Sequence, residues 1–147
     1  MSHFGEHAAG WLALGALGAS CDRPRRREWL VATASVAFAH GVSIGVKRLV
    51  RRPRPDDPSL EIRVSTPSRL SFPSSHACST TAAAVAYGAL LGRPISPVIV
   101  PPMLLSRLVL GVHFPTDVLV GSALGAFVAK AAGRVDRRLV DRQESPR

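Results

Sequence analysis

Apolar residues form five runs along the chain, and polar, mostly arginine-rich connections separate them. The runs cover residues 4–20, 29–46, 77–92, 95–110 and 118–132, and small residues are abundant in all of them except 95–110. Only the run 29–46, eighteen residues without Asp, Glu, Lys or Arg, approaches the ~20 residues that a spanning helix needs. The pattern as a whole predicts an all-α membrane bundle with about five transmembrane helices.

Two of these runs carry small residues at four-residue spacing: Ala37, Gly41 and Gly45, and then Gly121, Gly125 and Ala129. Small side chains at this spacing let helices approach closely in lipid, where packing drives association. We therefore assign residues 1–133 to a membrane-embedded domain and 134–147 to a polar C-terminal tail, a frayed helix or disordered. A soluble alanine-rich helical bundle is the alternative, and a homo-oligomer stays open.

The formal net charge of +9 over 147 residues, with 5% aromatic residues, suggests an anionic partner. Nucleic acid, an anionic membrane surface and an anionic substrate all fit a basic chain. The sequence shows no basic sheet studded with aromatic residues, no helix-turn-helix and no zinc pattern, which disfavours nucleic acid. A membrane and an anionic substrate remain.

The arginines also predict an orientation. If the five helices alternate, residues 21–28, Arg93 and the tail share one face with ten arginines, and the other face has eight Lys or Arg. The positive-inside rule places the first face in the cytoplasm. We expect a multi-pass plasma membrane protein whose chemically suggestive residues lie on the extracytoplasmic side.

The richest chemistry is in the stretch 106–117, where an arginine, a histidine and an aspartate interrupt an otherwise apolar run. Gly111 is a plausible helix stop and Pro115 a plausible first helical residue. His113 would then stand at a corner beside Asp117, and such a pair leaves the imidazole Nε2 free as a nucleophile or base. Arg107 suits bidentate phosphate binding. A buried, charge-balanced Arg–Asp pair with a structural histidine is the alternative.

Basic residues also follow the second run. Lys47 at the helix end and Arg54 after it could converge on an anion, with Pro53 and Pro55 stiffening the backbone around Arg54. The alternative is a juxtamembrane basic cluster that meets lipid headgroups.

A possible proton donor precedes the third run. Ser74 or Ser75 is a natural N-cap, and the free N–H groups of a helix N-terminus bind anions. His76 would lie in the first turn, where it could deliver a proton. An ordinary capped helix with an interfacial histidine explains the stretch equally well.

Taken together, Lys47-x6-Arg54-Pro55, Pro73-Ser74-Ser75-His76 and Ser106-Arg107-x5-His113-x3-Asp117 resemble the three-part signature of the type 2 phosphatidic acid phosphatase superfamily. Order and spacing both match over residues 47–117. The chain departs from the family in having Ser75 where a glycine is usual, and in five predicted helices where membrane members commonly have six.

The resemblance implies a metal-independent lipid phosphate phosphatase without a cofactor. His113 would be the nucleophile, Asp117 would orient it, and His76 would be the general acid and base. The phosphate would be bound by Lys47, Arg54, Arg107 and the N–H groups at Ser74 and Ser75.

Residues 2–7, 67–74 and 106–113 look most like actinobacterial members of the superfamily, which act on polyprenyl-linked phosphosugars in arabinan precursor synthesis. Other lipid phosphates are the alternatives: a polyprenyl diphosphate, phosphatidate or phosphatidylglycerophosphate. A non-catalytic lipid-binding membrane protein is the alternative of another class, and the intact histidine and aspartate set argues against it. We expect headgroup contacts from His3, Glu6, His7 and Arg69. His3 and His7 have the spacing of metal ligands, but two histidines without a third are a weak signal.

Overall fold

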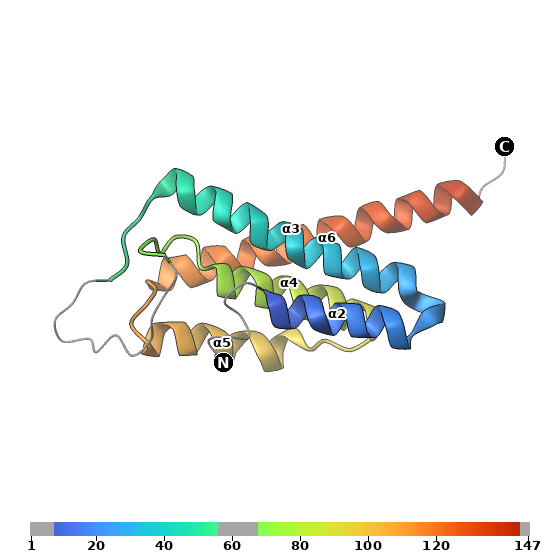
Figure 1. Cartoon of the computed structure of the whole chain (residues 1–147), viewed down its shortest axis with the longest axis horizontal. Helices are drawn as coiled ribbons and strands as arrows, with labels where there is room; N and C mark the ends of the chain where they lie inside the picture. The colour runs from blue at the N-terminus through green and yellow to red at the C-terminus, as the bar shows by residue number, and fades with distance from the viewer. Residues whose placement is uncertain (1–7, 56–67, 145–147) are drawn as a thin grey trace.

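The computed structural model describes residues 8–55 and 68–144 of the chain, and this part is all-helical (Figure 1). Its elements are α2 (Ala9–Cys21), the 3₁₀ turn η1 (Arg23–Arg25), α3 (Arg26–Val50), α4 (Ser75–Leu90), α5 (Ser96–Val109) and α6 (Pro115–Glu144). The five predicted runs correspond to the five α-helices, so the predicted all-α class is confirmed in the described residues.

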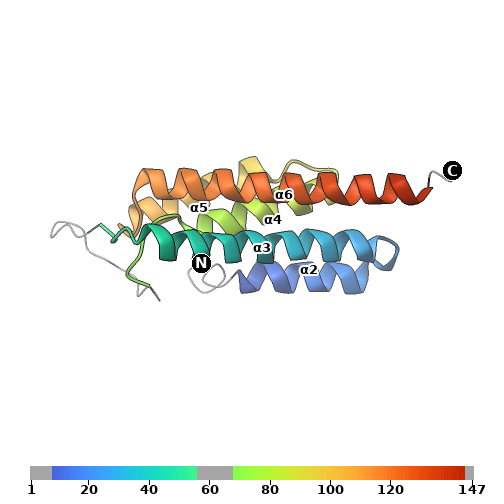
Figure 2. The same cartoon turned by 90° about the horizontal axis from the view of Figure 1, so that it is seen from above.

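Helix α4 is the centre of the bundle. It contacts each of the other four α-helices, which surround it in the two views of Figures 1 and 2. Most of its side chains are buried although they are small, including Ala82, Ala83 and Ala84. Small side chains allow neighbours to close on all sides of a helix, which explains how this 16-residue helix can be covered along most of its length.

One of the two small-residue patterns forms a helix contact within this chain. A Cβ at Gly121 would stand 2.5 Å from the Ser74 carbonyl oxygen, and one at Gly125 would collide with the Cys78 carbonyl oxygen. Helix α6 therefore lies directly against the backbone of α4. Gly41 and Gly45 of α3 face open space, so the other pattern has no packing role among the described residues.

The exterior of the bundle is apolar. Leu17, Phe38, Val98, Val109 and Phe127 are each more than 60% exposed, whereas the interior holds buried hydroxyl side chains, among them Ser35, Ser43, Ser79 and Thr80. Two stretches, Arg23–Val50 and Pro115–Gln143, are long and apolar enough to cross a membrane, and α2 and α5 are apolar but shorter. Length and composition thus mark two candidate spans, fewer than the five predicted.

Helix α6 continues past the predicted end of the embedded domain. The residues from Arg134 to Glu144, assigned above to a polar tail, prolong the same helix. An ion pair of 2.7 Å between Arg27 and Asp136 joins this extension to the start of α3.

The helix directions bring the three sequence motifs together. The C-terminal ends of α3 and α5 and the N-terminal ends of α4 and α6 all lie at one end of the bundle in Figure 1. The first two motifs lie at the end of α3 and the start of α4, and the third spans the end of α5 and the start of α6, although 70 residues separate Lys47 from Asp117. We call this region the catalytic end, after the role that the resemblance implies for these motifs.

Candidate active site

Two cations enter the site from α3 and the segment that follows it. Lys47, in the last turn of α3, is 8% exposed and its Nζ donates to the Leu70 carbonyl oxygen at 3.2 Å. Arg54 donates through Nε to the Ser68 carbonyl oxygen at 2.9 Å and through Nη1 to the Val112 carbonyl oxygen at 2.6 Å. Burial lowers the pKa of Arg54, Asp117 raises it and Arg107 lowers it further. These main-chain contacts fix both cations without neutralising them.

A short antiparallel pairing holds the Arg54 backbone. Pro53 forms an isolated bridge with Leu70, and the Arg54 N–H donates to the Arg69 carbonyl oxygen at 3.2 Å. The Ser71 N–H donates to the Arg52 carbonyl oxygen at 2.8 Å. The segment before α4 is thereby tied to the segment after α3. This long-range pairing restrains the backbone around Arg54, in addition to the stiffness expected from Pro53 and Pro55.

The corner between α5 and α6 is built as the sequence predicts. Gly111 follows the end of α5 and has φ +65°. This is a left-handed conformation, which glycine adopts at no steric cost. Pro115 begins α6, and Asp117 lies in its first turn. The Asp117 Oδ2 accepts the Phe114 N–H at 2.8 Å, the reciprocal bond by which an acidic third residue caps a helix. The aspartate is thus held by the start of its own helix.

His113 is the buried centre of this corner, 5% exposed. Its Nδ1 lies 3.5 Å from Asp117 Oδ2, and its Nε2 lies 3.4 Å from Arg54 Nη1. Both separations are long for hydrogen bonds, and catalytic contacts often tighten only when substrate binds. Because Nε2 faces a guanidinium donor, it must act as the acceptor, which leaves the proton of the neutral ring on Nδ1, toward the aspartate.

The surroundings keep His113 neutral. Burial lowers the pKa of His113 to about 3, and the positive charges of Arg54, Lys47, His76 and Arg107 lower it in the same direction. Arg107 is itself only 3% exposed. The site therefore combines a neutral imidazole with an excess of fixed positive charge, which suits an anionic ligand whose central atom the imidazole could attack.

The N-terminus of α4 supplies the remaining groups. Ser74 is the N-cap, and its hydroxyl accepts the Ala77 N–H at 3.4 Å. The Ser74 N–H donates to the Asp117 carbonyl oxygen at 2.9 Å, so this donor is already engaged. The expected contact from this N–H to phosphate stays a prediction. Ser75 and His76 begin the helix, and N–H groups in this first turn have no intrahelical acceptor.

Two residues that contact the site, Ser43 and Arg52, were not singled out from the sequence. Ser43 is fully buried, and its Oγ lies 2.9 Å from the Ser75 Oγ. It stands four residues before Lys47, on the same face of α3, which is the signal that could have found it. Arg52 was grouped with the surrounding basic residues, yet its Nη1 lies 3.2 Å from Asp117 Oδ1. Arg52 and Arg54 alternate with Pro53 and Pro55. This local pattern distinguishes them from Arg48 and Arg51.

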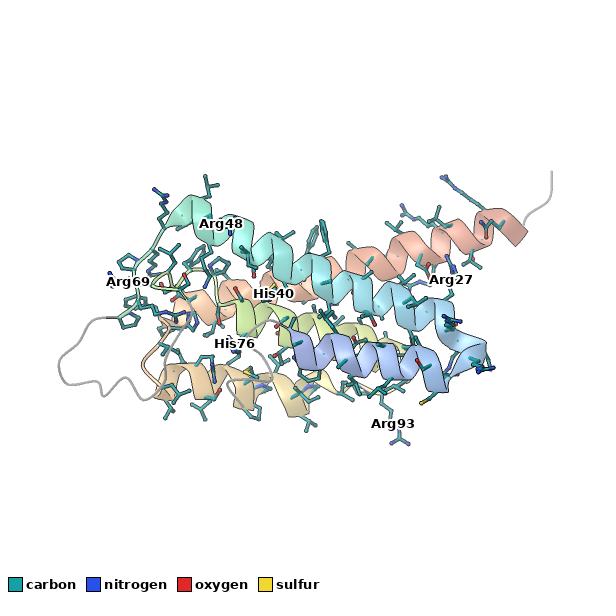
Figure 3. The ribbon with its side chains drawn as sticks, viewed as in Figure 1. Arg27, His40, Arg48, Arg69, His76 and Arg93 are labelled. Carbon is teal, nitrogen blue, oxygen red and sulfur yellow. The ribbon has the colours of Figure 1, made fainter. Side chains whose placement is uncertain are left out.

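Of the expected headgroup residues, His3, Glu6 and His7 lie outside the described part of the chain. Arg69 has an exposed side chain and lies at the catalytic end with Arg48 (Figure 3). Arg27 and Arg93 lie toward the other end, where a cavity of about 610 Å³ opens between α3, α4 and α6. That cavity includes none of the motif residues.

The described residues contain no group of three or more His, Cys, Asp or Glu side chains that could hold a metal ion. The positive charges at the site come from Lys47, Arg54 and Arg107. The side chains present therefore suit charge stabilisation by the protein itself.

Comparison with known proteins extends this picture. The decaprenylphosphoryl-5-phosphoribose phosphatase of Mycobacterium tuberculosis (strain CDC 1551 / Oshkosh) is 59% identical over 128 residues, 87% of this chain and 72% of that protein. The protein of the same name from Mycolicibacterium smegmatis (strain ATCC 700084 / mc(2)155) is 56% identical over 121 residues, 82% of this chain and 67% of that protein. No solved structure matches the chain.

The family model described as the PAP2 superfamily matches residues 28–140, which include all three motifs. This match covers most of the chain and confirms the resemblance drawn from the three motifs between Lys47 and Asp117. The chain belongs to the PAP2 superfamily.

Proposed function

We propose that the protein is a lipid phosphate phosphatase that converts decaprenylphosphoryl-5-phosphoribose to decaprenylphosphoryl-ribose through a phosphohistidine intermediate, in cell-wall arabinan precursor synthesis. The observation that carries the chemistry is the buried, neutral His113, with Nε2 toward Arg54 and Nδ1 toward Asp117. The substrate is taken from the names of the two relatives.

In this proposal the phosphate dianion occupies the space bounded by the cations. Lys47, Arg54 and Arg107 neutralise its charge, which grows on the equatorial oxygens as the transition state forms. The N–H groups of Ser75 and His76 point from the start of α4 and add the favourable end of the helix dipole. No metal ion is needed in this scheme, because these groups supply the positive charge.

Turnover then takes two steps. The Nε2 lone pair of His113 attacks phosphorus in line, and the bond to the ester oxygen breaks while His76 protonates the leaving alcohol. Asp117 balances the positive charge that appears on the phosphorylated ring. In the second step His76 removes a proton from water, the resulting oxygen attacks phosphorus, and the bond to His113 breaks to release inorganic phosphate.

A membrane location fits a lipid substrate. Apolar side chains cover the outside of α2, α3, α5 and α6 while hydroxyl groups gather inside, the distribution expected of helices that face lipid. In the proposed arrangement all five helices are embedded in the plasma membrane, with α2, α4 and α5 shorter than the spanning pair. A polyprenyl chain would then lie against the apolar exterior while its headgroup reaches the catalytic end.

Headgroup selection needs residues outside the phosphate site, because phosphate binding is common to the superfamily. Arg69 is the described residue best placed for this role, since its carbonyl oxygen accepts the Arg54 N–H and its side chain is exposed. We propose it as a contact to the sugar, together with residues of the N-terminal segment.

The decisive experiment compares purified wild type with His113→Ala. The wild type should release phosphate from decaprenylphosphoryl-5-phosphoribose and acquire an acid-labile phosphate label, and His113→Ala should lose both while keeping its melting temperature. A variant that retains more than a few per cent of the activity would contradict the assignment of the nucleophile.

Chelation, inhibition by vanadate and a panel of other lipids test the rest of the proposal in the same assay. EDTA should leave the rate unchanged and vanadate should inhibit; loss on chelation that Mg²⁺ or Zn²⁺ restores would overturn the metal-free scheme. A panel with polyprenyl diphosphate, phosphatidate and phosphatidylglycerophosphate should show the highest kcat/KM for the phosphoribose lipid. Binding without hydrolysis of every lipid would indicate a lipid-binding protein instead.

A further inference from the structure

Arg52 connects the segment after α3 to the first turn of α6. Its Nη1 donates to the Thr116 Oγ1 at 2.8 Å and lies 3.2 Å from Asp117 Oδ1. Its guanidinium carbon stands 4.0 Å from the centroid of the Phe114 ring. The same side chain therefore makes a hydrogen bond, an ion pair and a cation–π contact, all with residues of the corner that carries His113.

The partner of this arginine is a carboxylate with no access to water, since Asp117 is 0% exposed. Ionised groups in such positions are costly unless they are paired and hydrogen-bonded. One oxygen, Oδ2, accepts the Phe114 N–H and faces the Nδ1 of His113. The other, Oδ1, is held by Arg52. Bonds to both oxygens fix the plane of the carboxylate and so the direction from which it meets the imidazole.

Arg52 is itself held in place before any ligand arrives. Its carbonyl oxygen accepts the Ser71 N–H at 2.8 Å and is approached by the Ser71 Oγ at 3.4 Å. Stacking on Phe114 restricts its planar group further. A side chain that is pre-organised in this way loses little additional freedom on binding its partner.

We infer that Arg52 is a positioning residue, which holds the Asp117 carboxylate so that the aspartate can orient and stabilise His113 during phosphoryl transfer. It acts through Asp117 and does not bind the phosphate. This inference rests on the proposed function, because it assigns Arg52 to the phosphohistidine step. It also gives separate tasks to the two arginines of one motif: Arg54 faces the nucleophile and Arg52 faces the residue that orients it.

The test compares Arg52→Gln and Arg52→Lys with the wild type, and Arg48→Gln is the matched control because Arg48 is an exposed arginine only four residues earlier, in the last turn of α3. Arg52→Gln should lower kcat on the order of 10- to 100-fold, the usual effect of losing a group that orients an active-site side chain. Its KM for the phosphoribose lipid should stay within about threefold, because ground-state binding is untouched. Arg52→Lys should recover part of kcat.

A rapid acid quench identifies the step. Arg52→Gln should form the phosphohistidine more slowly than wild type, whereas Arg48→Gln should match wild type in rate and in melting temperature. A raised KM with unchanged kcat would show that Arg52 contacts the substrate, and kinetics equal to wild type would show an inert surface pair; either result overturns the inference. If the wild type forms no phosphoenzyme, the phosphohistidine mechanism of the proposed function is contradicted instead.

For the case in which Arg52→Gln fails to fold, Thr116→Val provides a second variant. It removes only the 2.8 Å bond that helps to aim the guanidinium. A severalfold loss of kcat at constant KM is expected, and unchanged kinetics in this folded variant would also count against the positioning role.

Discussion

At the scale of single residues, Ser75 shows how the chain accommodates a departure from its family. Its Oγ lies 2.9 Å from the Oγ of Ser43, which is fully buried one turn before Lys47 on α3. The serine hydroxyl thus joins α3, which carries Lys47, to the start of α4, where we propose that phosphate binds. The Ser75 N–H is unaffected, because any residue except proline can supply it.

We predict that Ser43→Ala and Ser75→Ala each lower the free energy of unfolding by about 1 kcal/mol, the usual net worth of a hydrogen bond. The double variant should lose no more than the larger single loss, because both changes delete the same contact. Activity should stay within about threefold, since the N–H donors remain.

Thermal unfolding and phosphate release measure both effects. Ser20→Ala is the control, because Ser20 is exposed and its hydroxyl bonds only the Ala16 carbonyl oxygen of its own helix. Losses that add in the double variant would mean that the two hydroxyls act independently.

At the scale of elements, the site depends on how closely α6 approaches α4. Gly121 lies against the Ser74 carbonyl oxygen and Gly125 against that of Cys78. This approach allows the first turn of α6 to reach the cap of α4, where the Ser74 N–H donates to the Asp117 carbonyl oxygen at 2.9 Å. This main-chain bond therefore joins the residue proposed to orient His113 to the helix proposed to bind phosphate.

We predict that Gly125→Ala destabilises the protein by about 1–3 kcal/mol, because a methyl group at this position meets backbone that cannot move aside. Gly41→Ala is the matched control: it is also within a helix, but its Cβ would meet nothing within 4 Å. That control should be neutral or gain up to about 1 kcal/mol from helix propensity.

Melting temperatures of the two variants in the same detergent give the comparison. Gly125→Ala should also lose phosphatase activity at temperatures where Gly41→Ala keeps it. Equal melting temperatures would contradict the close contact between α4 and α6.

At the scale of the whole molecule, α6 relates the active site to the membrane. The helix begins at Pro115, beside the corner that carries His113, and continues for 30 residues to Glu144. At 1.5 Å per residue this is roughly 45 Å, longer than the hydrocarbon core of a bilayer. If α6 spans the membrane, the catalytic end and the C-terminal end lie on opposite faces, whether or not the shorter helices cross completely.

We predict that the C-terminal end is cytoplasmic and the catalytic end extracytoplasmic, following the ten-to-eight distribution of basic residues between the two faces. A reporter fused after Arg147 should give a cytoplasmic signal. In a Cys21→Ser background, Arg69→Cys should react with a membrane-impermeant thiol reagent in intact cells.

The native Cys21 provides the opposing control, because it is exposed at the end of α2. It should react only after the cells are permeabilised. Labelling of Cys21 in intact cells, with Arg69→Cys protected, would invert the orientation.

What the sequence determined by itself is local. Gly111 ends α5, Pro115 begins α6 and a serine at 74 or 75 caps α4, because each of these features depends on the backbone preferences of one residue and its neighbours. The structure selects Ser74 as the cap. The three motifs were recognisable for the same reason, since each is contiguous or nearly so. The five helices and the residues that gather at the catalytic end were predicted on this basis.

Only the tertiary structure decided which groups meet across the chain. The Arg52 pair with Asp117 joins residues 65 positions apart, and the bond from Ser74 to the Asp117 carbonyl removes a donor that local rules leave free. Gly125 makes a close helix contact and Gly41 does not, although both belong to a run of small residues at four-residue spacing. That spacing alone does not specify which glycine packs against another helix. These contacts depend on how helices rotate and approach one another, and no local preference specifies that geometry.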